Sequence, residues 1–349
     1  MGVGRKALLD VLGNRMPERR PIWFMRQAGR YLPEYRELRR QAGSFLDLCY
    51  SPKLASQVTM QPIDRYDLDA AILFSDILVV PQAMGVGLRF AEGEGPILDV
   101  VADMEAVARL KPVRDARQVA AVCETVSRTR QGLPGHVALI GFCGAPWTVA
   151  SYMIEGGSSE ERLKARLAAH RRPSWYDALM DRLIEASCDY LSAQVMAGAE
   201  VLQIFDSWAG DLTGDVFEDS VIGPIRTIVD ELRLRHPSVP VIVFARGAGS
   251  KHGRVAAETG AQAVGIEQAV ELASVLKAVP EHCAVQGNLD PVALLAGGER
   301  LARRVENVIR EVPLHRHVFN LGHGIKPATD PAHVAEAIAA VRAADTRRP

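Results

Sequence analysis

The 349-residue sequence lacks the features that mark several large classes of protein. Its five cysteines form no C-x-x-C pair, so nothing indicates a zinc ribbon or a disulfide-rich secreted scaffold. No apolar run approaches the length of a membrane span, and the N-terminus lacks the apolar segment of a signal peptide. The formal net charge of -1 gives none of the overall positive field that nucleic-acid-binding proteins use. These absences predict a cytoplasmic protein with free thiols that binds neither nucleic acid nor a membrane.

The chain also lacks the glycine-rich loops that bind nucleotides. Gly247, Gly249 and Gly253 are not spaced as the G-x-G-x-x-G pattern requires, and no G-K-[ST] sequence is present. We therefore expect no nucleotide cofactor.

The composition is that of a globular protein with a large core, because 48% of the residues are hydrophobic and 24% are charged. No linker, repeat or low-complexity tract divides the chain. We expect one domain over residues 1–349.

Short apolar runs alternate with helical patterns along the chain. About eight of them are predicted strands, the number that a closed parallel barrel requires: 22–25, 71–74, 137–142, 201–205, 241–245, 262–266, 284–286 and 318–321. Several are apolar throughout, as strands buried on both faces are. Ser51-Pro52, Asp290-Pro291 and Asp330-Pro331 each place a capping side chain before a proline, which predicts a helix start. The connection over 80–100, rich in glycine, is predicted to be an inserted loop or hairpin. The sequence thus predicts an α/β fold, a single (β/α)8 TIM-type barrel.

Polar and glycine-rich residues follow nearly every predicted strand. In chain order they are Arg26-Gln27-Ala28-Gly29-Arg30, Ser75-Asp76, Gly144-Ala145 with Tyr152 close behind, Asp206-Ser207, Arg246-Gly247, Gly287-Asn288 and Gly322-His323-Gly324. The active sites of α/β barrels lie at the carboxyl ends of the strands and take residues from several loops. We therefore expect the active-site cleft at this end of the barrel.

The loop from Arg26 to Arg30 is the most informative of these segments. Gly29 and Pro33 argue against a regular helix through Arg30, so the two arginines are expected on a loop. A guanidinium stays charged and presents a planar fork of donors that matches a carboxylate or a phosphate. The pair therefore suits a ligand with several acidic groups.

These segments resemble the uroporphyrinogen decarboxylase family, whose members remove acetate carboxyl groups from a cyclic tetrapyrrole on the way to haem. The matching stretches run in the family's order over residues 21–325 and read PIWFMRQAGRYLPEYR, AAILFSDILVVP, GAPWTVASYMIEGG, IFDSWAG, QGNLDP and FNLGHGI. One position departs from the family pattern: Glu267-Gln268 stands where an Asp-Trp pair is expected, and no role is assigned to that loop.

The resemblance implies a homodimer that decarboxylates the four acetate side chains of uroporphyrinogen III to methyl groups, giving coproporphyrinogen III, without cofactor or metal. The electron-rich pyrrole, once protonated, accepts the electrons that CO2 leaves behind. Asp76 and Arg26 are then the catalytic residues, with Asp76 accepting from the four pyrrole N–H groups and stabilising the cationic ring. The other substrate-binding positions implied are Gln27, Ala28, Gly29, Arg30, Tyr152, Ser207 and His323.

The residues themselves leave three points open. The proton donor is a water positioned by Arg26, a protonated Asp76, or His323, whose ordinary pKa near 6.5 also suits a carboxylate contact. Arg246 either adds positive charge to the cleft or forms a salt bridge. Asn288 lies in a turn that caps a helix, which favours a structural role.

Two other functions compete with decarboxylation. Zinc-dependent methyl transfer on the same fold needs a His-x-Cys pair with a distant cysteine, whereas His282 and Cys283 are adjacent here. A non-catalytic tetrapyrrole carrier would keep the arginines but would not need a buried anion such as Asp76.

Overall fold

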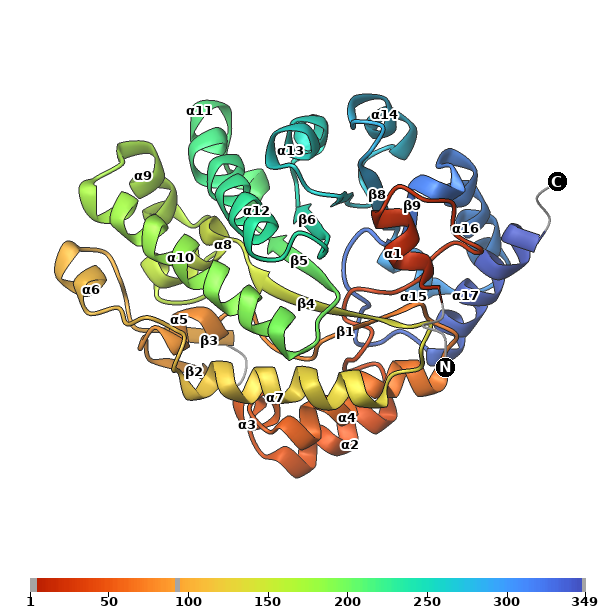
Figure 1. Ribbon diagram of the computed structural model, residues 1–349, viewed down its shortest axis with the longest axis horizontal. Helices are drawn as coiled ribbons and strands as arrows, with labels where there is room; N and C mark the ends of the chain where they lie inside the picture. The colour runs from red at the N-terminus through yellow and green to blue at the C-terminus, as the bar shows by residue number, and fades with distance from the viewer. Residues whose placement is uncertain (1–4, 92–94, 347–349) are drawn as a thin grey trace.

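The computed structural model describes residues 5–91 and 95–346, and a parallel sheet wrapped by helices forms its centre (Figure 1). The strands are β1 (Ala70–Ile72), β2 (Leu88–Ala91), β3 (Gly95–Leu98), β4 (Ala138–Gly144), β5 (Val201–Asp206), β6 (Val241–Ala245), β7 (Ala263–Gly265), β8 (Ala284–Leu289) and β9 (His317–Leu321). Seven of them form one sheet in the order β1-β4-β5-β6-β7-β8-β9, with every neighbouring pair parallel.

Helices connect the strands and cover the outside of the sheet. Those of the first half are α1 (Ala7–Leu12), α2 (Pro33–Ala42), α3 (Phe45–Cys49), α4 (Pro52–Arg65), α5 (Val79–Ala83), α6 (Met104–Ala108), α7 (Arg117–Gly132), α8 (Pro146–Glu155) and α9 (Leu163–Arg171). Those of the second half are α10 (Ser174–Ala197), η1 (Ala209–Asp211), α11 (Gly214–Phe217), η2 (Glu218–Ile222), α12 (Gly223–Arg235), η3 (Gly249–Lys251), α13 (His252–Thr259), α14 (Leu272–Ala278), α15 (Pro291–Ala296), α16 (Glu299–Glu311), η4 (Leu314–Arg316) and α17 (Pro331–Thr346). The strands of the seven-stranded sheet are buried on both faces, which explains their continuously apolar sequence.

The segment around Ile22 lies between the two edge strands of the sheet and closes it. Ile22 forms a parallel bridge with Phe319 of β9, and its carbonyl accepts from the N–H of Asp69, directly before β1, at 2.9 Å. The prediction of a strand over 22–25 is wrong in extent, because the chain turns at Met25 and Arg26 and leaves a single bridge. The predicted barrel-type α/β fold is confirmed.

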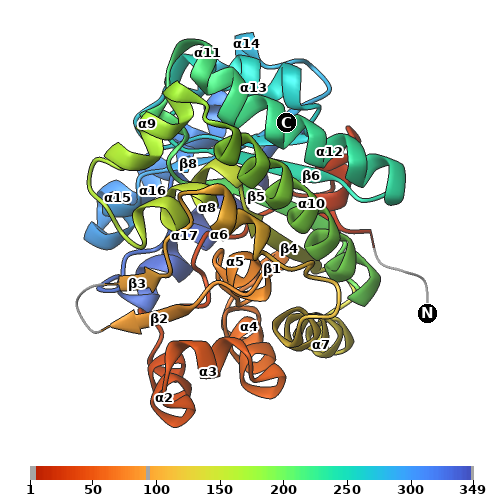
Figure 2. The same ribbon diagram turned by 90° about the vertical axis from the view of Figure 1, so that its left-hand side faces the viewer.

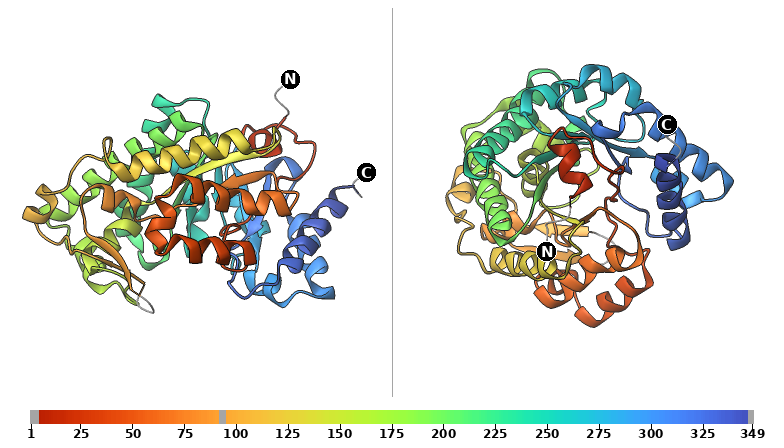
Figure 3. Two further views of the ribbon diagram at one scale, coloured as in Figure 1. Left: turned by 90° about the horizontal axis from the view of Figure 1, so that it is seen from below. Right: turned by 45° about the vertical axis from the view of Figure 1, so that its right-hand side comes forward.

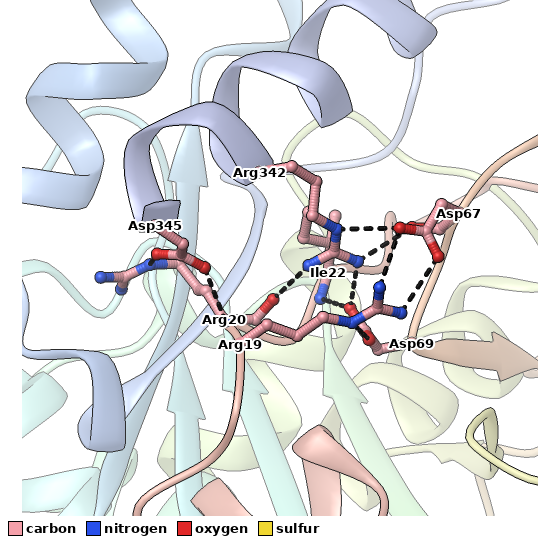
Figure 4. Close-up of polar contacts among 7 residues, drawn as sticks. All are labelled: Arg19, Arg20, Ile22, Asp67, Asp69, Arg342 and Asp345. Carbon is pink, nitrogen blue, oxygen red and sulfur yellow. Dashed lines mark hydrogen bonds and ion pairs between the residues drawn. The ribbon is translucent and has the colours of Figure 1, made fainter. Parts of the chain in front are cut away.

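An ion-pair cluster at Asp69 fixes this closure (Figure 4). Asp69 Oδ1 accepts from Arg19 at 2.8 Å, and Oδ2 accepts from the N–H of Ile22 at 2.8 Å and from Arg342 of α17 at 2.7 Å. Arg19 also donates to Asp67 at 2.9 Å. Since Asp69 directly precedes β1, the cluster ties α17 and the closing segment to the N-terminal end of the sheet.

Helix α1 lies over the same end, near the middle of the ring of helices in the right-hand view of Figure 3. Lys6 anchors it by donating to the carbonyl of Val137 at 2.8 Å and to Glu200 at 2.7 Å, directly before β4 and β5. A cavity of about 330 Å³ opens at this end, lined by Arg5, Ala7, Asp10, Glu18, Arg19, Asp67, Asp69 and His136. Its aspartates are held in ion pairs. The N-terminal end of such a barrel typically contributes to stability, and these pairs fit that role.

The predicted helix starts are confirmed. Helices α4, α15 and α17 begin at the expected prolines. Asp290 and Asp330 each accept from the N–H two residues further on, at 2.8 Å. Ser51 makes no such side-chain bond.

The connection over 80–100 contains the antiparallel hairpin β2–β3, which confirms that prediction. Figure 2 shows the hairpin beside α3, and the rings of Phe90 and Phe45 lie 4.9 Å apart, centroid to centroid. Within the described residues, no helix combines the length and the apolar character that crossing a membrane would take.

Candidate active site

The predicted site residues lie where the polypeptide leaves the carboxyl ends of the strands, opposite to α1. Asp76 follows β1, Tyr152 lies in α8 after β4, and Ser207 follows β5. His323 follows β9, and Arg26 leaves the closing segment beside it. The sequence therefore placed these five residues at one end of the fold.

Gln27 determines the shape of the Arg26–Arg30 loop. Its side chain is buried, accepts from the N–H of Phe24 at 2.9 Å and donates to the carbonyl of Ala70 at 3.0 Å. It thereby fixes the loop to β1, the strand that leads to Asp76. Gln27 thus acts on the site by holding the loop in place.

Arg26 has a left-handed backbone, with φ of 62°. Residues other than glycine avoid this region, and exceptions concentrate where the surrounding structure enforces them, often at functional sites. The N–H of Ile325 donates to the carbonyl of Met25 at 2.9 Å, which brings the segment after β9 against the loop. Arg26 is therefore held beside Gly324 and His323.

Cationic groups gather around His323. Burial, together with the charges of Arg26, Arg246 and Lys326, lowers the pKa of His323 to about 4. Arg26 opens to solvent at the cleft, yet desolvation by the surrounding protein lowers its pKa, followed by repulsion from Arg30. Arg246 thus belongs to the positive charge of the cleft. His323 is neutral around pH 7 in the unliganded protein.

Asp76 is a carboxylate held between an apolar environment and positive charge. Its Oδ1 accepts from the N–H of Leu78 at 2.8 Å. Burial raises the pKa of Asp76, while the Leu78 N–H and the charge of Arg26 act in the opposite direction. Such a group can stabilise a cation that forms beside it.

Tyr152 lies within the influence of both Asp76 and Arg26. Burial and then the charge of Asp76 raise the pKa of Tyr152, whereas a hydrogen bond from the Trp208 side chain lowers it. The two rings lie 6.3 Å apart, centroid to centroid. Trp208 also carries the guanidinium of Arg162 over its ring at 3.9 Å from the centroid.

Trp208 and Arg162 were not singled out in the sequence. Trp208 stands beside Ser207 in the IFDSWAG stretch. Arg162 comes from the distant loop before α9, so no local sequence signal predicts its contact with Trp208.

The remaining predicted positions complete the loop and its neighbours. Ser207 directly precedes Trp208 and is half-buried. Gly29 permits the turn, because a Cβ there would lie 2.9 Å from the carbonyl oxygen of Arg26. Ala28 packs at the edge of the core, and Arg30 is exposed.

Three phenylalanines from neighbouring strands form a row inside the barrel below the cleft. The rings of Phe142 and Phe205 lie 5.6 Å apart and those of Phe205 and Phe244 lie 6.3 Å apart, both edge to face. All three lie in predicted strands, and the sequence alone assigned them no role. An apolar row beneath a ring of cationic and hydroxyl groups suits a large, flat ligand with a polar rim.

The Glu267-Gln268 loop packs against the loops that follow the neighbouring strands at the cleft. Glu267 accepts from His252 at 2.7 Å and from the N–H of Gly249 at 3.3 Å, and its carbonyl accepts from Asn288 at 3.0 Å. A Cβ on Gly322 would lie 2.1 Å from the backbone nitrogen of Gln268. The loop thus connects the ends of β6, β8 and β9.

Within the part of the chain that the structure describes, no ligand set for zinc is assembled. Cys283 is buried directly before β8, so the adjacent His282-Cys283 pair lies at the N-terminal end of the sheet, away from the cleft. Across residues 5–91 and 95–346, no three side chains of His, Cys, Asp or Glu are grouped so that they could hold an ion.

Comparison with known proteins agrees with the geometry. The sequence profile of the family described as "Uroporphyrinogen decarboxylase (URO-D)" matches residues 4–344. A protein of Granulibacter bethesdensis named uroporphyrinogen decarboxylase is 50% identical over 340 residues, covering 97% of this chain and 99% of that protein. One of Rhodospirillum rubrum with the same name is 48% identical over 339 residues, covering 97% of each.

Among solved structures, a methyltransferase from Methanosarcina mazei superposes with a TM-score of 0.74 at 19% sequence identity, covering 97% of each chain. At this identity the similarity establishes the fold alone.

Proposed function

The chain belongs to the uroporphyrinogen decarboxylase family, whose activity in porphyrin and haem biosynthesis it shares, and we propose that its cleft converts the four acetate groups of uroporphyrinogen III to methyl groups, giving coproporphyrinogen III. The observation that carries this proposal is that Arg30, Arg246 and the half-buried carboxylate of Asp76 all lie within electrostatic reach of Arg26. The substrate offers the complementary pattern, with carboxylates around its rim and pyrrole N–H groups at its centre.

The arginines hold the carboxylates that stay on the substrate. Each guanidinium offers paired N–H donors and keeps its charge at any working pH. Arg26 and Arg30 come from one loop and Arg246 from the end of β6, so they reach the rim from different directions. Tyr152 and Ser207 supply hydroxyl donors between them, and neutral His323 adds a ring nitrogen.

Asp76 receives the inward-pointing pyrrole N–H groups and stabilises the positive charge that forms when a ring carbon is protonated. The carbon–carbon bond to the departing carboxylate then breaks, its electron pair flows into the cationic pyrrole, and CO2 leaves. A second proton on the exocyclic carbon completes the methyl group, and loss of the first proton from the ring carbon to the surrounding water restores the aromatic pyrrole. The pyrrole serves as the electron sink that other decarboxylases take from a cofactor.

Two groups compete to deliver the protons. Asp76 carries a raised pKa and therefore holds a proton more readily than an ordinary carboxylate. A water held by Arg26 is the other source. His323 is a poor donor in the empty cleft, because its pKa of about 4 leaves it unprotonated near pH 7.

Anaerobic incubation with uroporphyrinogen III, followed by chromatography of the oxidised porphyrins, tests the function. We expect species with progressively fewer carboxyl groups, ending at coproporphyrin. A tetrapyrrole carrier would return the substrate unchanged. Zinc analysis of the same preparation separates decarboxylation from the methyl-transfer alternative.

We further propose that the protein forms one domain and acts in the cytoplasm as a homodimer. All five cysteines are free, which fits a reducing compartment. Leu163 and Leu167, one turn apart on α9, are 55% and 40% exposed, an apolar strip that a second copy would cover. Light scattering gives the mass in solution, and a single cooperative unfolding transition is expected for one domain.

A further inference from the structure

Asp206 is an acidic residue that no part of the proposed mechanism uses. It ends β5 with a fully buried side chain, behind the wall that Phe205 lines. Its Oδ1 accepts from the hydroxyl of Thr148 in α8 at 2.6 Å. Its Oδ2 is buried and has no hydrogen-bond partner among the described residues. A buried carboxyl group with one unpartnered oxygen is unfavourable for the fold, so its retention requires an explanation.

Thr148 connects Asp206 to two residues of the cleft. Its Oγ1 accepts from the N–H of Trp208 at 3.2 Å, directly after Ser207. One helical turn further along α8 stands Tyr152, on the same side of the helix as Thr148. The carboxyl group of Asp206 therefore sits behind the junction between α8, which carries Tyr152, and the loop that carries Ser207.

We propose that Asp206 is a positioning residue that sets Ser207 and Tyr152 relative to each other through Thr148, and that loss of a single proton from its carboxyl group disturbs this arrangement. The inference rests on the proposed function of the two hydroxyl residues. In the protonated form the carbonyl oxygen accepts from Thr148, and no charge stands behind the barrel wall. On ionisation the proton passes to the solvent, and the carboxylate attracts the nearest donors, which are the Thr148 hydroxyl and the Trp208 N–H.

The surroundings of Asp206 favour the protonated form of its carboxyl group. The pKa of Asp206 is raised to about 7, chiefly by burial, and the negative charge of Asp211 in η1 acts in the same direction. Hydrogen bonds from Thr148 and the Trp208 N–H oppose the rise. On the α10 side the facing group is the Tyr176 hydroxyl, which donates to Ser220. Arg162, whose guanidinium lies over the ring of Trp208, is paired with Asp211.

The test compares the pH dependence of kcat and KM for wild type and Asp206→Asn. The amide has the shape of the acid and still accepts from Thr148, but it cannot ionise. We expect wild-type kcat to fall as the pH rises through about 7, where the pKa of Asp206 lies. Asp206→Asn should lack this alkaline fall, and at pH 6 its kcat should stay within about threefold of wild type because the hydrogen bond persists.

Thr148→Val breaks the connection itself and Thr148→Ser retains it. We expect Thr148→Val to lower kcat about tenfold, the factor that corresponds to one lost hydrogen bond, with KM nearly unchanged. Thr148→Ser should behave as wild type. A merely structural role would lower the melting temperature of both Asp206→Asn and Thr148→Val and would leave the alkaline limb in place.

Infrared difference spectra between acidic and alkaline pH provide a readout that needs no turnover. A protonated-carboxyl band should disappear on raising the pH of wild type and should be absent from Asp206→Asn. If the band disappears from wild type on raising the pH but wild type does not decarboxylate the substrate, the proposed function is refuted, whereas the titration of Asp206 is confirmed. An unchanged alkaline limb in Asp206→Asn would overturn the inference, and so would wild-type kcat in Thr148→Val.

Discussion

The backbone of Gly324 lies directly against the side chain of Arg26: a Cβ on Gly324 would stand 2.3 Å from Cδ and 2.6 Å from Cγ of that arginine. Arg26 itself is held at a positive φ of 62°. The Arg26 side chain can therefore occupy this position only because residue 324 carries no Cβ. The two residues are 298 positions apart along the chain, so only the closure of the barrel brings them together.

Gly324→Ala should displace the Arg26 side chain without unfolding the protein. Because the neighbouring atoms belong to a flexible side chain, the loss falls on substrate binding, and we expect KM to rise about tenfold, the effect of one weakened charge-assisted hydrogen bond. Steady-state kinetics measures this effect. Gly135→Ala is the matched control, since a Cβ on Gly135 meets nothing within 4 Å. Equal kinetics for the two variants would contradict the positioning of Arg26 by Gly324.

Gln27→Ala should destabilise the fold through the loop. It leaves the buried N–H of Phe24 and the buried carbonyl of Ala70 without their side-chain partner. Each group left unsatisfied lowers the free energy of unfolding by about 1–3 kcal/mol. Urea denaturation measures the free energy of unfolding. Gln41→Ala removes an exposed hydrogen bond to Glu37 and should change stability by less than about 0.5 kcal/mol. A similarly small change in Gln27→Ala would show that the loop needs no such anchor.

Arg246→Gln should raise the pKa of His323. Burial is the largest cause of the low pKa and stays in place, but removal of one neighbouring cation makes the imidazolium less unfavourable. Proton NMR titration of the ring should therefore show protonation at a higher pH in the variant than the value of about 4 in the parent protein. Arg39→Gln, on α2, serves as control and should leave the titration unchanged. An unshifted curve in Arg246→Gln would place Arg246 outside the cleft.

The linkage between His323 and stability follows from the same shift. The pKa in the folded protein lies below that of the unfolded chain, near 6.5, so the folded state is favoured above pH 6.5 and loses this advantage as the pH falls towards about 4. Because Arg246→Gln raises the pKa of His323 in the folded protein, it narrows the pH range over which stability falls, from the acidic side of that range.

The sequence predicted the parts of the fold that local chemistry determines. Buried parallel strands require continuously apolar runs, and Asp290 and Asp330 mark helix starts through their own side chains, so both could be recognised along the chain. The end of the strand at Ile22 could not, because it depends on Phe319 and Asp69, which lie far away in sequence.

The candidate site likewise contains residues that the sequence could identify and residues that it could not. Arg26, Asp76 and His323 stand in motifs that mark them, whereas the role of Gln27 as an anchor depends on where β1 passes. The approach of Arg162 to Trp208 and the buried setting of Asp206 arise from packing between distant segments, and no spacing in the sequence encodes them.

The central claim is that the negative charge of Asp76 stabilises a cationic pyrrole, and single-turnover decarboxylation by Asp76→Asn tests it most directly. Asparagine keeps the shape and an oxygen that accepts from the Leu78 N–H, so the substrate should still bind, while the rate falls about 100-fold to 1000-fold through loss of charge stabilisation. Asp64→Asn, at an exposed position, controls for the substitution itself. A rate near that of wild type in Asp76→Asn with bound substrate would contradict the account.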